Sequence, residues 1–152
     1  MADIKITLKS DHTREAKEEL MDRIRVGLEA VGIQAASAAR EELQKSPKRI
    51  DTGLLRNSIT HALDGESPKE GSYSADSASK YSGKTPEPGR YTGTTPKESD
   101  DRAAVYIGTN VNYAIYVHEG TDKMSPNPFL RRAVENNAAE LVEILKTQIG
   151  LK

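Results

Sequence analysis

The sequence predicts an α+β fold: a small antiparallel sheet packed by a long N-terminal helix and a C-terminal helix, in one domain covering residues 1–152. Three observations predict this class. Short stretches near 4–8, 58–63 and 104–107 are rich in β-formers or alternate apolar with polar residues, as strands do. Two longer stretches repeat apolar residues every three or four positions, which is typical of helices. Their order along the chain favours a sheet with its helices packed on one face.

The N-terminal part predicts a strand followed by a helix over residues 11–45. Apolar and polar residues alternate over 4–8, as in a half-buried strand. Asp11 or Thr13 can cap the helix, and Pro47 stops it. A helix of about 35 residues is roughly 50 Å long. This exceeds the width of so small a domain, and we expect part of the helix to pack on something else.

One apolar stripe along this helix predicts its buried face. Its members are Leu20, Ile24, Leu28, Val31, Ala35 and Ala38. The Ala-rich half lacks the bulky residues that a coiled-coil seam needs, which argues against that alternative. Gly27 and Gly32 lower the stability of the helix and predict the close approach of another backbone.

A single helical turn and a strand follow the long helix. Asp51 or Thr52 can cap the turn, which presents two adjacent leucines. The strand over 58–63 is interrupted by His61. Arg56, in the turn, is a candidate interface residue; the alternative is a solvated or locally paired arginine at the surface.

Residues 64–101 form a loop insertion of low complexity. Gly, Pro, Ser and Thr make up 20 of its 38 residues, and such a composition buries too little apolar surface to offset the entropy of an ordered chain. We therefore expect the segment to be mobile in isolation. Tyr73, Tyr81 and Tyr91 are spread along it, which leaves two alternatives: a flexible linker, or a segment that orders against a partner with these tyrosines as anchors.

The clearest pattern in the chain begins with β-formers over 104–107, which predict a strand. Tyr113, Tyr116 and Val117 then follow at helical spacing, on one side of a short turn that Gly120 closes. We expect both tyrosines to anchor this turn, with their hydroxyls bonded to the backbone or to a neighbouring subunit.

A second apolar stripe predicts the C-terminal helix, which Pro128 can begin and Gly150 can end. Its members are Phe129, Leu130, Ala133, Val134, Ala138, Leu141, Leu145 and Ile149. We expect Leu130, Val134 and Leu141 to be buried against the sheet. We expect the same of the apolar stripe on the N-terminal helix.

Composition and charge argue against several classes of protein. Lys and Arg number 22 and Asp and Glu 23, so the formal charge of −1 gives no electrostatic basis for binding nucleic acid or anionic membranes. The absence of cysteine leaves no disulfide framework, thiolate metal site or Cys nucleophile. No apolar run approaches the ~18 residues of a membrane span, and residues 1–4 lack the features of a signal peptide. We expect a soluble protein made in the cytoplasm.

Motifs for catalysis are not found. The chain lacks a phosphate loop, a dinucleotide fingerprint and a nucleophile elbow. His12, His61 and His118 are isolated from one another, without the spacing of metal ligands. His118 and Glu119 are adjacent and suggest an acid–base pair, but no nucleophile or second base is fixed near them in sequence. The alternative is that both rim the tyrosine cluster or bond the backbone at the turn. We expect no enzyme activity, cofactor or metal.

Five stretches, in this order and with sensible spacing, resemble a known family. They are Asp51–Ile59, Ile107–Asn110, Tyr113–Ala114, Val117–Thr121 and Pro126–Ala133. The chain resembles the tail-completion, or head–tail joining, proteins of long-tailed bacteriophages over residues 10–63 and 102–148, without the insertion. Members of that family often have an acidic residue where this chain has His118, with Glu119 beside it.

The resemblance implies an α+β domain related to tail terminators and connector proteins, which forms a ring, commonly a homohexamer, at the neck of the virion. Its implied partners are further copies of the chain, the connector or head-completion protein and the tail tube protein. DNA passes through the lumen of such a ring without sequence-specific binding. A near-neutral subunit suits that role, because a strongly basic lumen would hold the DNA. The resemblance implies no catalytic residue.

Two other hypotheses stay open: a non-structural cytoplasmic binding module or assembly chaperone whose insertion folds on a partner, and an enzyme that uses His118 and Glu119. Within the structural hypothesis, the sequence does not separate a tail-completion ring from a tail terminator or a head-side stopper. Eight residues are expected to contact a neighbouring subunit or partner: Arg56, Tyr73, Tyr81, Tyr91, Tyr113, Tyr116, His118 and Glu119.

Overall fold

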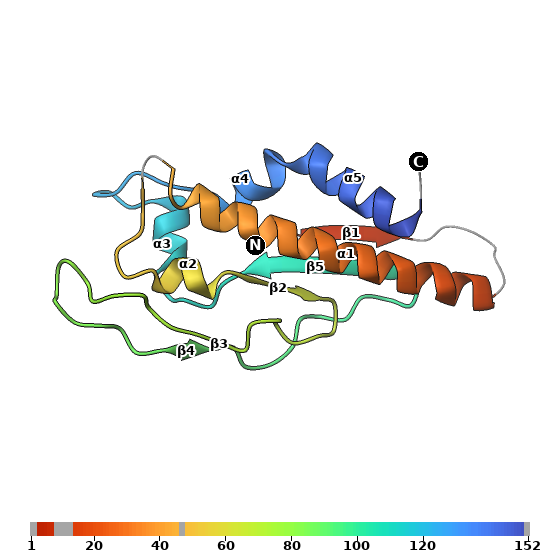
Figure 1. Cartoon of the computed structure of the whole chain (residues 1–152), viewed down its shortest axis with the longest axis horizontal. Helices are drawn as coiled ribbons and strands as arrows, with labels where there is room; N and C mark the ends of the chain where they lie inside the picture. The colour runs from red at the N-terminus through yellow and green to blue at the C-terminus, as the bar shows by residue number, and fades with distance from the viewer. Residues whose placement is uncertain (1–2, 8–13, 46–47, 151–152) are drawn as a thin grey trace.

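The fold is the predicted small antiparallel sheet with helices packed against it (Figure 1). The computed structural model describes residues 3–7, 14–45 and 48–150. In the order in which they pair, the strands of the sheet are β1 (Asp3–Thr7), β5 (Arg102–Gly108) and β2 (Thr60–Leu63). Four predicted features lie outside the described residues: the strand end at Leu8, the helix caps Asp11 and Thr13, and the helix stop at Pro47.

The central strand β5 directs one row of side chains toward helix α1 (Arg14–Glu42). Val105 lies opposite Ile4 of β1 and Leu63 of β2, in antiparallel register. All three side chains belong to, or pack against, the hydrophobic core. Because successive residues of a strand point to opposite faces, Ala104 faces away from α1. It is nevertheless fully buried, so a further layer covers that face.

Helix α1 runs along most of the length of the domain (Figure 1). Its 29 residues make it roughly 44 Å long. Ile24, Leu28, Val31 and Ala35 of the predicted stripe are all buried, which confirms the predicted phase of the helix.

Two glycines of α1 allow close packing, as predicted, but their neighbours are side chains and not another backbone. A Cβ atom on Gly32 would lie 2.7 Å from atoms of His61 and of Val105. A Cβ atom on Gly27 would lie 2.7 Å from Leu145. These positions set how closely α1 approaches the sheet on one side and the C-terminal helix on another.

The predicted C-terminal helix is divided into α4 (Phe129–Glu135) and α5 (Ala138–Ile149). Between them the side-chain amide of Asn137 donates to the Ala133 carbonyl at 2.9 Å. Such a side-chain bond competes with continuation of the backbone ladder.

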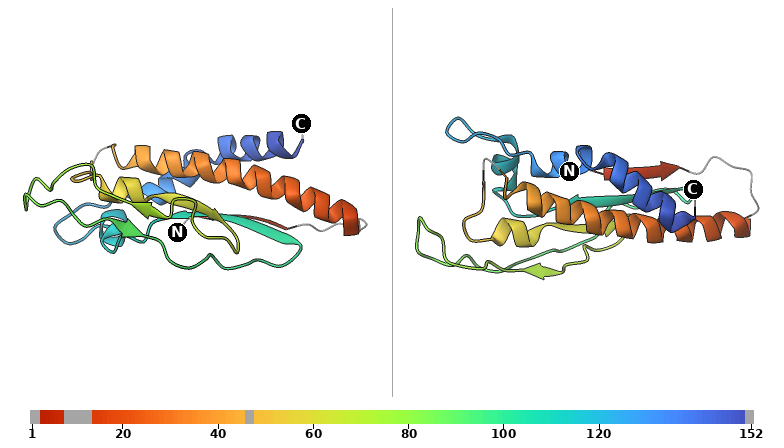
Figure 2. Two further views of the ribbon diagram at one scale, coloured as in Figure 1. Left: turned by 60° about the horizontal axis from the view of Figure 1, so that its bottom comes forward. Right: turned by 45° about the horizontal axis from the view of Figure 1, so that its top comes forward.

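Helix α5 packs chiefly on α1 (Figure 2). Leu141 is buried, as expected, but the main contacts of α5 are with α1 and not with the sheet. Leu130 and Val134 of α4 are half-buried and pack at the margin of the core.

The insertion 64–101 covers the face of the sheet that α1 leaves open (Figure 2, left). It folds back on itself as an irregular hairpin that contains the short strands β3 (Ser72–Tyr73) and β4 (Gly89–Arg90). The Thr60 hydroxyl of β2 accepts the backbone N–H of Glu70 at 3.2 Å. This third layer explains the burial of Ala104 on the face away from α1.

The remaining helices are α2 (Leu54–Ser58) and α3 (Ala114–Glu119). Of the two residues predicted to cap α2, Thr52 accepts the Leu54 N–H at 3.2 Å, whereas Asp51 bonds the insertion. In the part of the chain that the structure describes, no helix is both long and apolar enough to cross a membrane. The same residues hold no cluster of three or more His, Asp or Glu side chains fit to bind a metal.

Candidate subunit interface

Helix α3 directs its apolar residues both inward and outward. Ala114 and Val117 are buried, whereas Ile115 and Tyr116 are 63 % and 59 % exposed. The prediction that Tyr116 and Val117 lie on one side of the turn is therefore wrong. Adjacent residues of a helix point about 100° apart, and in this short helix Ala114 and Val117, three residues apart, take the inward side.

Tyr113, just before α3, is tied to its own chain. It is 40 % exposed. Burial raises the pKa of its hydroxyl, and hydrogen bonding with the Leu55 backbone opposes part of that rise. At the other end of α3, Gly120 has a φ of +80°, and a Cβ atom there would lie 2.8 Å from the Pro126 nitrogen. The turn therefore ends as predicted, at a position that requires glycine.

His118 and Glu119 join α3 to α4. The Nδ1 atom of His118 lies 2.7 Å from a Glu119 carboxylate oxygen, and its Nε2 atom accepts the Arg131 backbone N–H at 3.4 Å. Nδ1 therefore carries the proton that is donated to Glu119. The Arg131 guanidinium also pairs with Glu119, at 3.3 Å. The hydrogen bond from His118, and after it the charge of Arg131, lowers the pKa of Glu119.

A cleft of about 630 Å³ lies between α3 and α4. The His118 ring forms part of its wall and meets the Phe129 ring edge-on, with centroids 5.4 Å apart. Its apolar lining residues are Val111, Ala114, Ile115, Phe129, Leu130 and Val134. The two polar residues that sequence reasoning singled out thus border a cleft of mixed polar and apolar lining, together with Arg131.

Two tyrosines of the insertion contact the body of the same chain. The Tyr91 hydroxyl donates to the Ser58 carbonyl, and burial raises its pKa. The Tyr73 hydroxyl donates to the Asn110 side chain. The two rings are 5.4 Å apart. Tyr81, in contrast, is 91 % exposed. The structure therefore leaves Tyr81 as the insertion tyrosine that is open to a partner.

Polar residues near α2 hold the outer half of the insertion. Arg56 pairs with Asp76, which is the locally paired alternative considered for this arginine. The Asn57 amide donates to Asp76 at 2.9 Å and to the Ser74 carbonyl at 2.9 Å. Sequence reasoning missed Asn57 and Asp76, because nothing local marks two residues from separate segments as partners.

The far end of the hairpin, residues 79–84, is the insertion tip, and Asp51 fixes it. One Asp51 oxygen accepts the Ser79 hydroxyl at 2.5 Å, and the other accepts the Lys80 backbone N–H at 2.8 Å. These two hydrogen bonds lower the pKa of the Asp51 carboxyl; the bond from the Ser79 hydroxyl has the larger effect, and the bond from the Lys80 N–H comes next. The tip closes with the Gly83 N–H donating to the Ser79 carbonyl at 2.9 Å. It is therefore held in place although its side chains are exposed.

A second cleft, of about 510 Å³, separates the insertion tip from α3. Tyr81 and Lys84 of the tip line one side, and Tyr113 and Val117 line another. Tyr81 and the exposed residues of α3 consequently belong to one end of the molecule.

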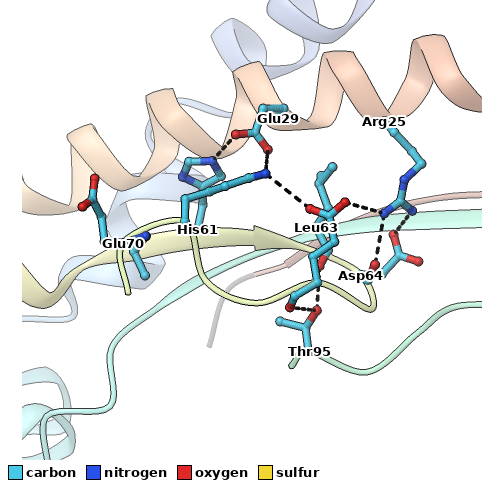
Figure 3. Close-up of polar contacts among 10 residues, drawn as sticks. Arg25, Glu29, His61, Leu63, Asp64, Glu70 and Thr95 are labelled. Atoms are coloured by element: carbon cyan, nitrogen blue, oxygen red, sulfur yellow. Dashed lines mark hydrogen bonds and ion pairs between the residues drawn. The ribbon is translucent and has the colours of Figure 1, made fainter. Parts of the chain in front are cut away.

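The base of the insertion is held by charged residues of α1 (Figure 3). Arg25 donates to Asp64 at 2.7 Å, and Asp64 is only 4 % exposed. One turn further along, Glu29 lies 2.8 Å from the Nε2 atom of the buried His61. His61, which interrupts the strand pattern, thus has a carboxylate partner on α1. The contact of Arg25 with Asp64 ties the first residue of the insertion to α1.

The exposed large apolar side chains of the described residues fall into two groups. The first, here called the α3 group, lies on α3 and the insertion tip and comprises Tyr81, Tyr113, Ile115 and Tyr116. The second, the helix-pair group, lies on α1 and α5 and comprises Val26, Ile33 and Val142. Sequence reasoning missed the second group. The sequence feature that could have identified this group is the spacing of Val26 and Ile33, which are seven residues apart and therefore lie on one side of α1.

Comparison of the chain with protein-family models, with curated proteins and with solved structures finds no match.

Proposed function

We propose that the chain is a structural virion protein, one subunit of a ring at the bacteriophage head–tail junction that leaves a lumen for DNA. The observation that carries this proposal is the division of the exposed apolar residues into the α3 group and the helix-pair group. Two unlike patches on one chain suit a heterologous contact, in which each copy offers a different surface to each neighbour. Repetition of that contact gives a closed ring when the rotation between copies closes.

The stretches that carry the family resemblance also converge in space, which supports the proposal. The Ser58 hydroxyl lies 2.5 Å from the Thr109 hydroxyl, which joins the first stretch to the second. The Asn127 N–H donates to the Val117 carbonyl at 2.9 Å, which joins the fourth to the fifth. Residues distant in sequence thus form one unit around α2, α3 and α4, as expected if they serve a common purpose.

The proposed partners are further copies of the chain, in a ring that the resemblance suggests is a hexamer, with the connector or head-completion protein and the tail tube protein on its two sides. The proposed location is the head–tail junction of the virion. Duplex DNA would cross the lumen without sequence-specific contact, in keeping with a formal charge of −1.

Deletion of the gene from the phage genome that encodes it tests the role directly. We expect filled heads and finished tails that fail to join, and recovery of infectious particles when the intact gene is supplied. Portal and tail genes should flank this gene. Normal particles after deletion would overturn the proposal. Loss of tails or heads altogether, with the protein absent from purified virions, would instead indicate the assembly-chaperone alternative.

A further inference from the structure

We propose that the insertion tip of one copy docks on the outward face of α1 of the next copy, with Tyr81 against Val26 and the tip lysines beside acidic residues of α1. This inference rests on the proposed ring and names the two surfaces that meet.

The tip is prepared for binding because its backbone is already fixed. Asp51 holds Ser79 and Lys80, and the Ser79 hydroxyl accepts the N–H of Tyr81 at 3.1 Å. The order of the tip therefore costs little further entropy on binding. It presents Tyr81, 91 % exposed, between Lys80 and Lys84. Neither lysine lies within ion-pair distance of a described carboxylate, although the charge of Lys80 acts on Asp51 of its own chain.

The complementary surface is a row of exposed residues on α1, here called the α1 outer stripe. Its members are Glu15, Glu19, Asp22, Val26 and Ile33. Spacings of four, three, four and seven place them on one side of the helix, opposite the buried stripe that faces the sheet. The outer stripe is acidic in its first two turns and aliphatic from Val26 onward. Glu19 pairs with Arg23 at 2.9 Å, whereas Asp22 has no ion pair with another described residue.

The chemistry of the two surfaces is complementary. An aromatic side chain flanked by cations meets an aliphatic side chain with an acidic residue one turn away, where side chains lie about 5–6 Å apart. Tyrosine contributes contact area at low entropic cost, which is why it is enriched in interfaces. The lysines fix the register and speed association through charge complementarity.

The two surfaces lie at opposite ends of the elongated domain. In Figure 1 the insertion tip is at the far left, whereas α1 begins at the far right and extends from there toward the left. The insertion tip therefore cannot reach the α1 outer stripe of its own chain, and it can dock only on the stripe of a neighbouring copy. Duplex DNA is the competing occupant of a basic, aromatic tip. Two lysines do not make a phosphate-binding track, and the chain has a formal charge of −1, so the observations favour a second copy.

Disulfide cross-linking tests the contact cleanly, because the chain contains no cysteine. The test protein is the full chain with Tyr81→Cys and Val26→Cys, oxidised at the concentration where it assembles. The matched control carries Tyr81→Cys and Glu41→Cys, an exposed position on the same helix about four turns away. Both substituted sites of the test pair are exposed, so the fold should be retained, which circular dichroism checks.

We expect a ladder of covalently linked copies for the Val26 pair and none for the Glu41 pair. Closed rings in images, with equal cross-linking of both pairs, would overturn the docking and leave the proposed ring standing. A Val26-specific ladder in open filaments would support the docking and contradict the ring. Absence of any ladder, with duplex-DNA binding that Lys80→Glu weakens, would overturn the docking in favour of DNA.

A charge exchange provides a second measurement that does not depend on disulfide geometry. Lys80→Glu with Lys84→Glu should raise the dissociation constant between copies about tenfold at low salt, and less at high salt. Adding Glu19→Lys and Asp22→Lys to the same chain should restore most of the affinity. If the substitutions on α1 do not restore the affinity that the tip substitutions remove, the proposed pairing of tip and stripe is wrong.

Discussion

Replacement of Leu141 by Ala tests the packing of α5 on α1, the feature of the core that the sequence did not predict correctly. Leu141 is 1 % exposed. The change removes three buried carbon atoms, worth about 2.4 kcal/mol at ~0.8 kcal/mol each. The cavity left between the helices adds to this loss. We therefore expect the free energy of unfolding to fall by about 2.5–5 kcal/mol.

The assay is urea denaturation followed by circular dichroism, at a concentration below assembly because association would add its own stability. The control is Val142→Ala, the next residue on the same helix, which is 49 % exposed. This control should change the free energy by less than about 0.5 kcal/mol. A loss for Leu141→Ala no larger than that of the control would refute the placement of α5.

Three further predictions concern the insertion and the helix–sheet contact. Tyr91→Phe removes the hydroxyl that bonds the body of the domain, and should cost about 0.5–1.5 kcal/mol and speed amide exchange in the insertion; unchanged exchange would contradict this anchoring. Because the pKa of Asp51 is lowered from 3.8, its stabilising contribution is complete above that value and is lost as the pH falls through the lower folded value. Protection of the Lys80 amide should follow that loss, and a loss beginning above pH 3.8 would contradict the prediction. Gly32→Ala should cost about 1–3 kcal/mol through overpacking, whereas Gly71→Ala, with nothing within 4 Å of the new Cβ atom, should change stability by less than about 1 kcal/mol; similar costs would count against the close helix–sheet contact.

The sheet and α1 could be predicted from the sequence because their burial is recorded in a regular spacing. Ile24, Leu28 and Val31 repeat at helical intervals, and the structure buries all three. The division between α4 and α5 could not be predicted in this way. The apolar stripe continues across Asn137, and what interrupts the helix is a hydrogen bond from that side chain to the Ala133 carbonyl.

The candidate site was predicted less completely. Composition and spacing indicate which apolar residues are buried, but they do not indicate which polar residues pair with one another. The insertion has few apolar residues, yet Asp51, Asn57 and Ser58 of the body each bond it. No spacing rule connects those residues to partners 17 to 33 positions away. Tyr73 and Tyr91 were predicted to contact a partner, whereas the structure places them against their own chain. The helix-pair group was visible in the sequence only as the exposed counterpart of the buried stripe.

If two unlike surfaces join copies of the chain head to tail, the mass and shape of the assembled protein will show it. Negative-stain images combined with mass photometry, over a range of concentrations, give both quantities in one experiment. We expect a closed ring of fixed copy number with an open centre. Monomers alone, or dimers with two-fold symmetry that stop at two copies, would contradict it.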